Sequence, residues 1–147
     1  MLAVEGLLAG YGGSRVLHGL SFAVGAGEVV TLLGRNGMGK TTTVRAVMGL
    51  LKPQGGRIAF DGADVTGLPS YRIAQRGIGL VPEGRQVFPT LTVEENLTAT
   101  SAARDGAPRW TLPAIWRLFP ALAERRRNLG SQLSGGEQQM LAIGRAL

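Results

Sequence analysis

The chain has 147 residues, 44% of them hydrophobic, and its 16 basic and 10 acidic side chains give a formal net charge of +6. This apolar composition excludes a disordered chain, while the absence of cysteine and the single histidine, His18, exclude disulfide scaffolds and cysteine- or histidine-based zinc sites. The 23 glycines follow no three-residue period, which excludes collagen and indicates glycine-rich loops.

The first third of the chain predicts strands, then a glycine-rich loop and a helix. Leu2–Leu8 and Arg15–Val24 flank the turn Tyr11–Ser14, a pattern typical of an antiparallel hairpin. The apolar, β-branched run Glu28–Leu33 ends at a glycine and predicts a strand buried on both faces. Apolar residues at helical spacing predict a helix over Lys40–Leu51.

The middle of the chain predicts three short elements. Arg57–Phe60 reads as a strand, and Pro69–Gln75 as a helix with proline near its start. Ile78–Val81 predicts a second buried strand. Because strands and helices alternate, we expect an α/β fold with a parallel sheet.

From about residue 84 onward the sequence predicts mainly helices. Thr92-Val-Glu-Glu95 has the T-x-x-E form of a capping box and predicts a helix running to about Thr100. A polar loop is expected at Ala102–Arg109, because it contains glycine and proline. Leu112–Leu122 predicts a further helix, with a proline near each end.

The segment from Gly34 to Thr41 reads Gly-Arg-Asn-Gly-Met-Gly-Lys-Thr and matches the phosphate-loop pattern G-x-x-x-x-G-K-[ST], between a predicted strand and a predicted helix. Glycines let successive backbone N–H groups surround phosphate oxygens, and the positive end of the following helix faces the same anion. Lys40 is expected to reach the β and γ phosphates of ATP, and the Thr41 hydroxyl to bind Mg²⁺. One of only two lysines in the chain stands at this position, which argues against a chance match.

A second motif, Leu133-Ser-Gly-Gly-Glu-Gln-Gln139, contains another capping box at Ser134. It predicts a helix whose apolar periodicity continues to Leu147, so the chain is expected to be cut inside a helix. About ninety residues after the phosphate loop, this segment resembles the signature motif of ATP-binding-cassette (ABC) ATPases.

The resemblance covers the whole chain and implies the fold of a P-loop NTPase. It implies an α/β ABC ATPase core, a parallel sheet with antiparallel N-terminal strands, joined to a helical subdomain. The expected division is an ATP-binding core at residues 1–83, a helical subdomain at 84–140 and the start of a return to the core at 141–147.

The same resemblance implies a nucleotide site shared by two subunits. Tyr11 is expected to stack on the adenine of ATP. The expected phosphate ligands are Gly34, Arg35, Asn36, Gly37, Gly39, Lys40, Thr41 and Thr42. Ser134, Gly135 and Gly136 are expected to cap the γ-phosphate of the ATP bound to the partner subunit. Lys40 and Glu83 are the expected catalytic residues, and Thr41 and Glu83 the expected Mg²⁺ ligands. Glu83 stands where the family usually has the glutamine of its Q-loop.

Three stretches of the sequence resemble one subfamily of ABC ATPases in particular. Val81–Leu97, Leu118–Leu122 and Leu133–Leu147 are similar to the ATP-binding subunits of branched-chain amino acid importers, which commonly carry glutamate at the position of Glu83. The partners implied are a second ATPase subunit in a head-to-tail dimer and membrane-spanning permease subunits. No nucleic acid is expected as a partner, and the expected location is cytoplasmic, peripheral on the inner face of the cell membrane.

In the family, a Walker B segment of four apolar residues and Asp-Glu follows the signature helix, and a switch histidine comes later. The sequence shows neither, so we expect the domain to be truncated before Walker B and this chain alone not to be hydrolytically competent.

Two alternative functions stay open: a non-transport ABC ATPase of DNA repair or translation, and a non-catalytic nucleotide-binding module. The solute also stays open, since similar importers carry urea and short amides.

Overall fold

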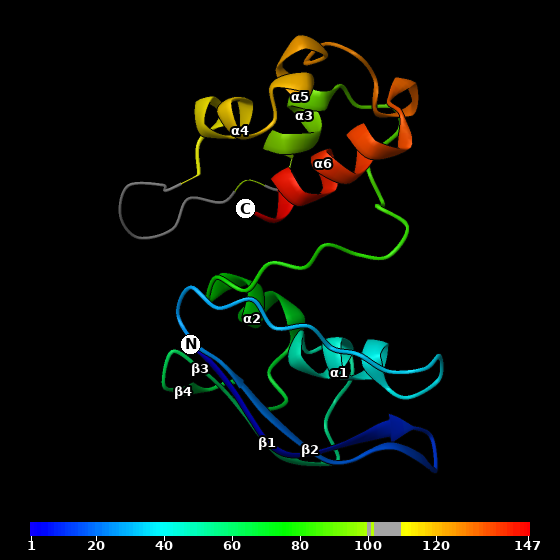
Figure 1. Cartoon of the computed structure of the whole chain (residues 1–147), viewed down its shortest axis with the longest axis vertical. Coiled ribbons are helices and arrows are strands. Elements are labelled where there is room, and N and C mark those ends of the chain that lie inside the picture. Colours follow the sequence, from blue (N-terminus) through cyan, green and yellow to red (C-terminus); the bar gives the residue numbers. More distant parts are fainter. Residues whose placement is uncertain (100, 102–109) are drawn as a thin grey trace. The chain divides into compact units, whose positions relative to one another are not determined.

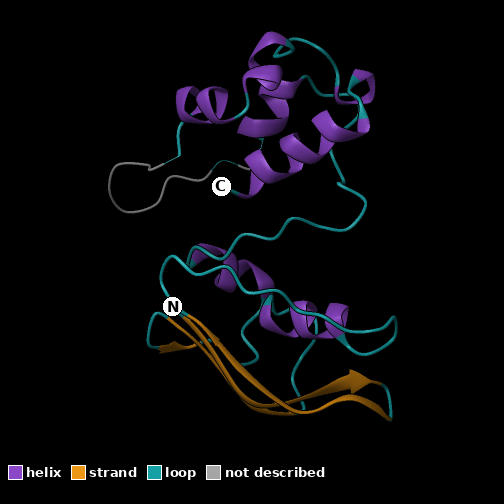
Figure 2. Ribbon diagram, viewed as in Figure 1, coloured by secondary structure: helices purple, strands orange, loops and turns teal. Residues whose placement is uncertain are grey.

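The computed structural model describes residues 1–99, 101 and 110–147, which form two compact units, Met1–Ile78 and Gly79–Leu147 (Figures 1 and 2). Every strand of the described residues belongs to the first unit, and the second unit consists of helices and loops. The functional division expected at residue 83 stays a prediction. The loop predicted at Ala102–Arg109 lies outside the described residues.

The first unit is built on a four-stranded antiparallel sheet with the order β2-β1-β3-β4. Its strands are β1 (Leu2–Tyr11), β2 (Ser14–Val24), β3 (Gly55–Phe60) and β4 (Ala63–Asp64). The predicted hairpin is confirmed: Tyr11 pairs with Ser14 across the two-glycine turn. The strand predicted at Arg57–Phe60 is also confirmed, whereas the two-residue β4 was not predicted.

Helices α1 (Lys40–Val47) and α2 (Ser70–Gln75) lie on one side of this sheet (Figure 2). The core of the unit is made of apolar side chains from the sheet, the two helices and the segments after them: Val4, Leu7, Ala9, Leu17, Ala46, Val47, Met48, Ile58, Val65 and Ile73. Burial of this apolar face against the sheet fixes the position of α1, whose first residue follows the phosphate loop.

Helix α1 ends four residues before the predicted end at Leu51, because Gly49 stops it. Gly49 has a φ of +64°, and its N–H donates to the Ala46 carbonyl at 3.2 Å. The N–H of Leu50 donates to the Arg45 carbonyl at 2.8 Å, which completes a Schellman motif. A side chain at Gly49 would also collide with the Leu68 carbonyl, so this close approach requires glycine.

The two buried strands predicted at Glu28–Leu33 and Ile78–Val81 are wrong for the described structure. Neither segment pairs with a strand, and the side chains of Val29 and Leu33 are 95% and 85% exposed. A parallel strand is buried only where strands flank it and helices cover both faces of the sheet. The sheet of the first unit is antiparallel throughout, and its edge strands are β2 and β4, so it provides no such place for either run.

The second unit is helical. Its elements are α3 (Val93–Thr98), α4 (Leu112–Leu118), α5 (Pro120–Glu124), a 3₁₀ turn (Gly130–Gln132) and α6 (Gly135–Ala146). Both capping boxes are confirmed, with Thr92 and Ser134 as the N-cap residues. The single helix predicted at Leu112–Leu122 is two helices, because Phe119 precedes a proline and has the non-helical angles φ −128° and ψ 77°.

The core of the second unit joins all four helices. Its buried apolar side chains are Val93, Leu97, Ile115, Leu122, Leu133 and Leu141. Asn96 is fully buried beside them, and its amide accepts from the Phe88 N–H and donates to the carbonyls of Phe88, Leu91 and Thr92 at 2.8 to 3.1 Å. A buried amide is tolerated when its hydrogen bonds are satisfied, and here they fix the turn that leads into α3.

Candidate nucleotide-binding site

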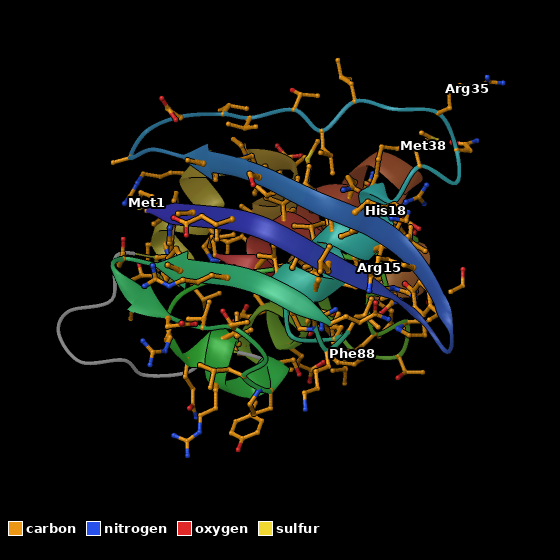
Figure 3. All side chains as sticks on the ribbon, turned by 90° about the horizontal axis from the view of Figure 1, so that it is seen from below. Met1, Arg15, His18, Arg35, Met38 and Phe88 are labelled. Carbon is orange, nitrogen blue, oxygen red and sulfur yellow. The ribbon has the colours of Figure 1, made fainter. Side chains whose placement is uncertain are left out.

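The phosphate loop occupies residues 34–39 and leads directly into α1. Gly37 and Gly39 have φ angles of +85° and +91°, a left-handed region that glycine adopts without strain. The Lys40 ammonium donates to the carbonyls of Gly34 at 2.6 Å and Arg35 at 3.0 Å. The lysine side chain therefore folds back over the loop, while Figure 3 shows the Arg35 side chain pointing outward from it.

Gly39 is the most constrained residue of this loop. It is buried, and a Cβ added to it would lie 2.6 Å from Cδ2 of Leu17 on β2. Its carbonyl accepts from the N–H of Thr43 at 2.8 Å and from the Thr43 hydroxyl at 2.9 Å. These contacts hold the loop against β2 on one side and the first turn of α1 on the other.

Tyr11 and Thr42, both predicted to bind the nucleotide, meet at the start of α1. Thr42 is 6% exposed, and a hydrogen bond with its side chain lowers the pKa of the Tyr11 phenol from its ordinary value. The Arg45 guanidinium adds a second, weaker effect in the same direction and lies 3.4 Å from the Tyr11 hydroxyl. The Tyr11 side chain remains 45% exposed, so part of the residue stays accessible beside the phosphate loop.

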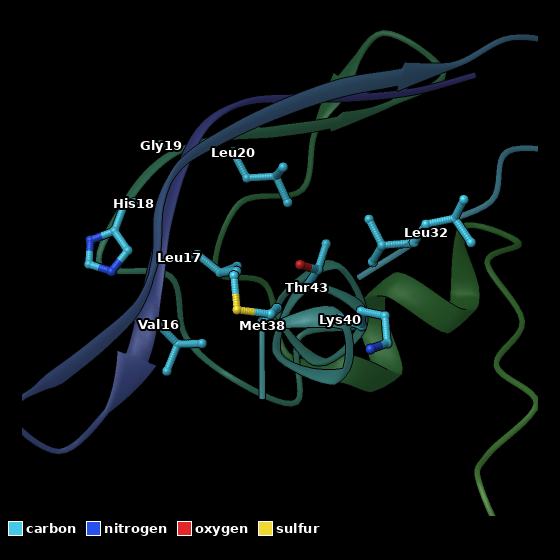
Figure 4. Close-up of a pocket in the computed structure, with 10 residues that line it drawn as sticks. Val16, Leu17, His18, Gly19, Leu20, Leu32, Met38, Lys40 and Thr43 are labelled. Carbon is cyan, nitrogen blue, oxygen red and sulfur yellow. The ribbon is translucent and has the colours of Figure 1, made fainter. Parts of the chain in front are cut away.

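A cavity of about 360 Å³ lies between β2 and the phosphate loop (Figure 4). In Figure 4, Leu17 of β2 points toward Met38 and Thr43, and Lys40 lines the same cavity. Leu32 and Leu33 complete its apolar lining, so the run predicted to be a buried strand borders an open space. Most of the lining is apolar, and Lys40 is the one cation among the lining residues.

The signature segment caps α6 in the second unit. The Ser134 N–H donates to Oε2 of Glu137 at 2.7 Å, and the Glu137 N–H donates to Oγ of Ser134 at 3.3 Å. The hydrogen bonds with Ser134 lower the pKa of the Glu137 carboxyl, and Arg125, 2.6 Å from Oε1, lowers it further. Ser134 is thereby fixed as the N-cap of a twelve-residue helix, and Gly135 and Gly136 begin its first turn, where backbone N–H groups favour an anion.

Arg85 lies against this helix end and was not identified from the sequence. A Cβ at Gly135 would lie 3.1 Å from Nη1 of Arg85, and the same nitrogen donates to Oε1 of Gln138 at 3.2 Å. Glu83 precedes it in a turn closed by the Arg85 N–H, which donates to the Pro82 carbonyl at 3.3 Å. Arginine has no special preference for such turns, so the sequence carries no signal for this contact.

The structure therefore brings the predicted residues together in two groups. Tyr11 and residues 34–42 lie around the start of α1 in the first unit, whereas Glu83 and residues 134–136 belong to the second. Within the part of the chain that the structure describes, no three histidine, cysteine or acidic side chains gather as a metal site. No helix among residues 1–99 and 110–147 is long and apolar enough to span a bilayer.

Sequence relatives place these motifs in one family. The family model described as "ABC transporter" matches residues 17–147. The chain is 43% identical over its full length to the high-affinity branched-chain amino acid transport ATP-binding protein BraG of Pseudomonas aeruginosa, and covers 64% of that relative. It is 41% identical, again over its full length, to the lipopolysaccharide export system ATP-binding protein LptB of Haemophilus influenzae, and covers 62% of it.

Solved structures agree with this placement. A nucleotide-free ATP-binding cassette from an ABC transporter matches the whole chain with a TM-score of 0.84 at 28% identity, and the match covers 64% of that cassette. A dimeric bacterial ABC transporter cassette matches with a TM-score of 0.79 at 26% identity, and 69% of it is covered. The chain thus spans about three fifths of the curated relatives it matches. It belongs to the ABC transporter family and has the P-loop NTPase fold of an ABC ATPase.

Proposed function

We propose that this chain binds ATP together with Mg²⁺ at residues 34–42 and forms the ATP-binding part of a transport ATPase. The observation that carries the proposal is the phosphate loop itself. Its two left-handed glycines, its lysine folded over the loop and the helix that begins at Lys40 form one contiguous element. These are the parts that cradle and neutralise a triphosphate in P-loop NTPases.

The residues present fit ATP. Gly39 packs so closely on Leu17 that only glycine fits there, and this contact holds the loop at the start of α1, where backbone N–H groups favour an anion. The Lys40 ammonium, held by two neutral carbonyls, would form stronger charge-assisted hydrogen bonds with phosphate oxygens. When bound, Mg²⁺ would supply charge neutralisation at the triphosphate, with the Thr41 hydroxyl as a ligand from this unit, and Glu83 stays the second ligand expected from the sequence.

We also propose that the subunit works as a head-to-tail pair. Ser134 and the glycines after it would face the γ-phosphate of the ATP bound to the partner, because a capped helix N-terminus offers backbone donors to an anion. The dimeric structure of a similar bacterial ABC transporter cassette supports pairing, and the head-to-tail orientation is part of our proposal. In the whole protein, pairing would align both nucleotides for hydrolysis.

The transport substrate that we propose is a branched-chain amino acid or a similar small solute, taken up through membrane-spanning permease subunits. The identity to BraG and the glutamate at position 83 support import. The second candidate is lipopolysaccharide export, favoured by the nearly equal identity to LptB. In either case the subunit would lie in the cytoplasm against the inner face of the membrane.

Titration calorimetry with Mg-ATP tests nucleotide binding. Lys40→Ala should abolish or severely reduce the affinity, because the triphosphate loses its main cation while its charge remains. The chain offers a matched control, since its only other lysine, Lys52, is exposed at the end of the α1 region. Lys52→Ala should bind as the parent does. Equal affinities for the parent and the Lys40→Ala variant would contradict the assignment.

A transport assay separates the two substrates. Deleting the encoding gene in its native cell should abolish high-affinity uptake of labelled leucine and leave lipopolysaccharide at the cell surface unchanged. The reverse result would support the export role suggested by the LptB relative. Restoring the gene with the codon for Lys40 changed to alanine should not restore uptake, whereas the Lys52→Ala form should.

A further inference from the structure

Residues 84–86 form a strained turn directly after Glu83. Gly84, Arg85 and Gln86 have φ angles of +73°, +64° and +47°, so three consecutive residues are left-handed and two of them are not glycine. The Gln86 N–H donates to the Gly84 carbonyl at 2.6 Å, which closes a three-residue γ-turn around Arg85. A γ-turn with positive φ at its centre is the rarer and more strained form. Such a turn persists only where its surroundings hold it.

Two arginines hold this turn on helix α6. Arg85 reaches from the turn to the first part of the helix, where it contacts Gly135 and donates to Gln138. Arg145 reaches back from the last turn of the helix: its Nη1 donates to the Gln86 carbonyl at 2.7 Å, and its guanidinium lies 4.3 Å from the centre of the Phe88 ring. The two contacts on α6 are seven residues apart, which is about 10 Å along a helix.

Residues 79–86 contact α6 at separate points and do not pack on it along their whole length. A cavity of about 280 Å³ lies between residues 79–86 and α6. It is lined by Leu80, Pro82, Arg85 and Gln86 of the first and by Ala142, Arg145 and Ala146 of the helix. The backbone of Gly79 meets the Ala146 carbonyl so closely that a side chain there would collide with it. Nε of Arg145 is buried with no hydrogen-bond partner among the described residues. Residues 79–86 are therefore held on α6 at a few separate points, with a cavity between them.

We propose that Arg145, together with Arg85, is a positioning residue that clamps the strained turn 84–86 to α6, so that Glu83 and the Ser134 end of that helix move as one body. This deepens the proposed function and rests on it, because Glu83 and Ser134 are the residues assigned to the metal and to the partner's phosphate. Without the Arg145 contacts the turn relaxes toward unstrained angles, and Arg85 leaves Gly135.

Amide hydrogen exchange of the 147-residue chain without nucleotide tests the clamp. Arg145→Met should speed exchange about tenfold at Gln86 and at Glu137 and Gln138 in the first turn of α6, whose N–H groups are hydrogen-bonded. Leu97 in α3 serves as the internal reference and should keep its parent rate. Arg145→Lys should rescue part of the protection, because lysine can donate to the Gln86 carbonyl but lacks the planar group that stacks on Phe88.

The matched control is Arg117→Met, an equal change at an exposed residue of α4, which should leave all of these rates unchanged. Faster exchange at Gln86 alone, with the first turn of α6 unaffected, would overturn the clamp. Equal acceleration in α3 would show general destabilisation of the unit and would overturn it too. If Arg145→Met does not fold, Arg85→Met makes the same test from the turn. Because no nucleotide is present, this outcome is independent of whether the chain binds ATP.

Discussion

Ser134 and Glu137 hold each other at the start of α6 through two reciprocal hydrogen bonds, one from each backbone N–H to the other side chain. The Ser134 side chain also hydrogen-bonds to the Glu137 carboxyl, so its hydroxyl takes part in the same capping box. The Glu137 carboxylate is in turn held by Arg125 at 2.6 Å. The serine assigned to a phosphate is therefore oriented before any ligand binds, and its orientation depends on a carboxylate in the same capping box.

Ser134→Ala should lower the free energy of unfolding of the second unit by about 1 kcal/mol, because the N-cap oxygen of α6 is lost. Urea unfolding followed by circular dichroism measures the change. The control is Ser131→Ala, which removes the same hydroxyl from an exposed residue of the preceding 3₁₀ turn and should be nearly neutral. A loss no larger than that of the control would mean that the cap contributes little.

The Glu137 carboxyl should make stability depend on pH. Its folded pKa is lowered from the ordinary value of 4.5, first by the hydrogen bonds with Ser134 and then by Arg125. Its contribution is therefore fully present above that value and is lost as pH falls through the lowered pKa. The difference in unfolding free energy between the parent and Glu137→Gln should shrink between about pH 6 and pH 3. A difference that stays constant with pH would refute this coupling; Glu124→Gln, at an exposed residue, controls for net charge.

Gly39→Ala should destabilise the first unit more than Gly37→Ala does. Both substitutions place a Cβ on a left-handed residue, at a cost of about 1 kcal/mol or more. At Gly39 the new Cβ also lies 2.6 Å from Leu17, whereas at Gly37 nothing lies within 4 Å. Thermal unfolding of the two variants measures the extra cost directly. Equal losses would show that β2 moves away from the loop at no cost.

Tyr11→Ala should weaken ATP binding about tenfold if the ring stacks on adenine, since base–aromatic stacking contributes about 1 to 3 kcal/mol. Tyr11→Phe keeps the ring but loses the hydrogen bonds with Thr42 and Arg45, so its affinity should stay near that of the parent. Calorimetry compares the three proteins. If Tyr11→Phe weakens ATP binding as much as Tyr11→Ala does, the affinity depends on the hydrogen bonds of the phenol and not on stacking of the ring.

The features that the sequence predicted correctly depend on neighbouring residues. The hairpin turn between Tyr11 and Ser14 and the capping boxes at Thr92 and Ser134 are set by side chains within three residues of one another. The phosphate-loop motif is local in the same sense, because its glycines and lysine all lie between residues 34 and 40, and its role as a nucleotide site stays a prediction. Local chemistry of this sort can be read from a single sequence.

The features that were wrong or missed depend on distant parts of the chain. The apolar run Glu28–Leu33 predicts burial, but whether it pairs depends on strands elsewhere, and in this structure none lies beside it. The clamp of Arg85 and Arg145 joins residues 53 and 59 positions apart in the sequence, and neither segment carries a pattern that predicts the contact. The buried Asn96 was missed because a polar residue in an amphipathic helix is ordinarily expected to face solvent.

The most direct test of the account is an NMR titration of the chain with Mg-ATP, following its backbone amide signals. We predict that the largest shifts fall on Gly37, Gly39, Lys40 and Thr41, because phosphate oxygens would accept hydrogen bonds from the N–H groups of this loop. The Lys40→Ala variant should show none of these shifts under the same conditions. The absence of shifts in the loop of the parent chain, or largest shifts at residues outside it, would contradict the assignment of the phosphate site.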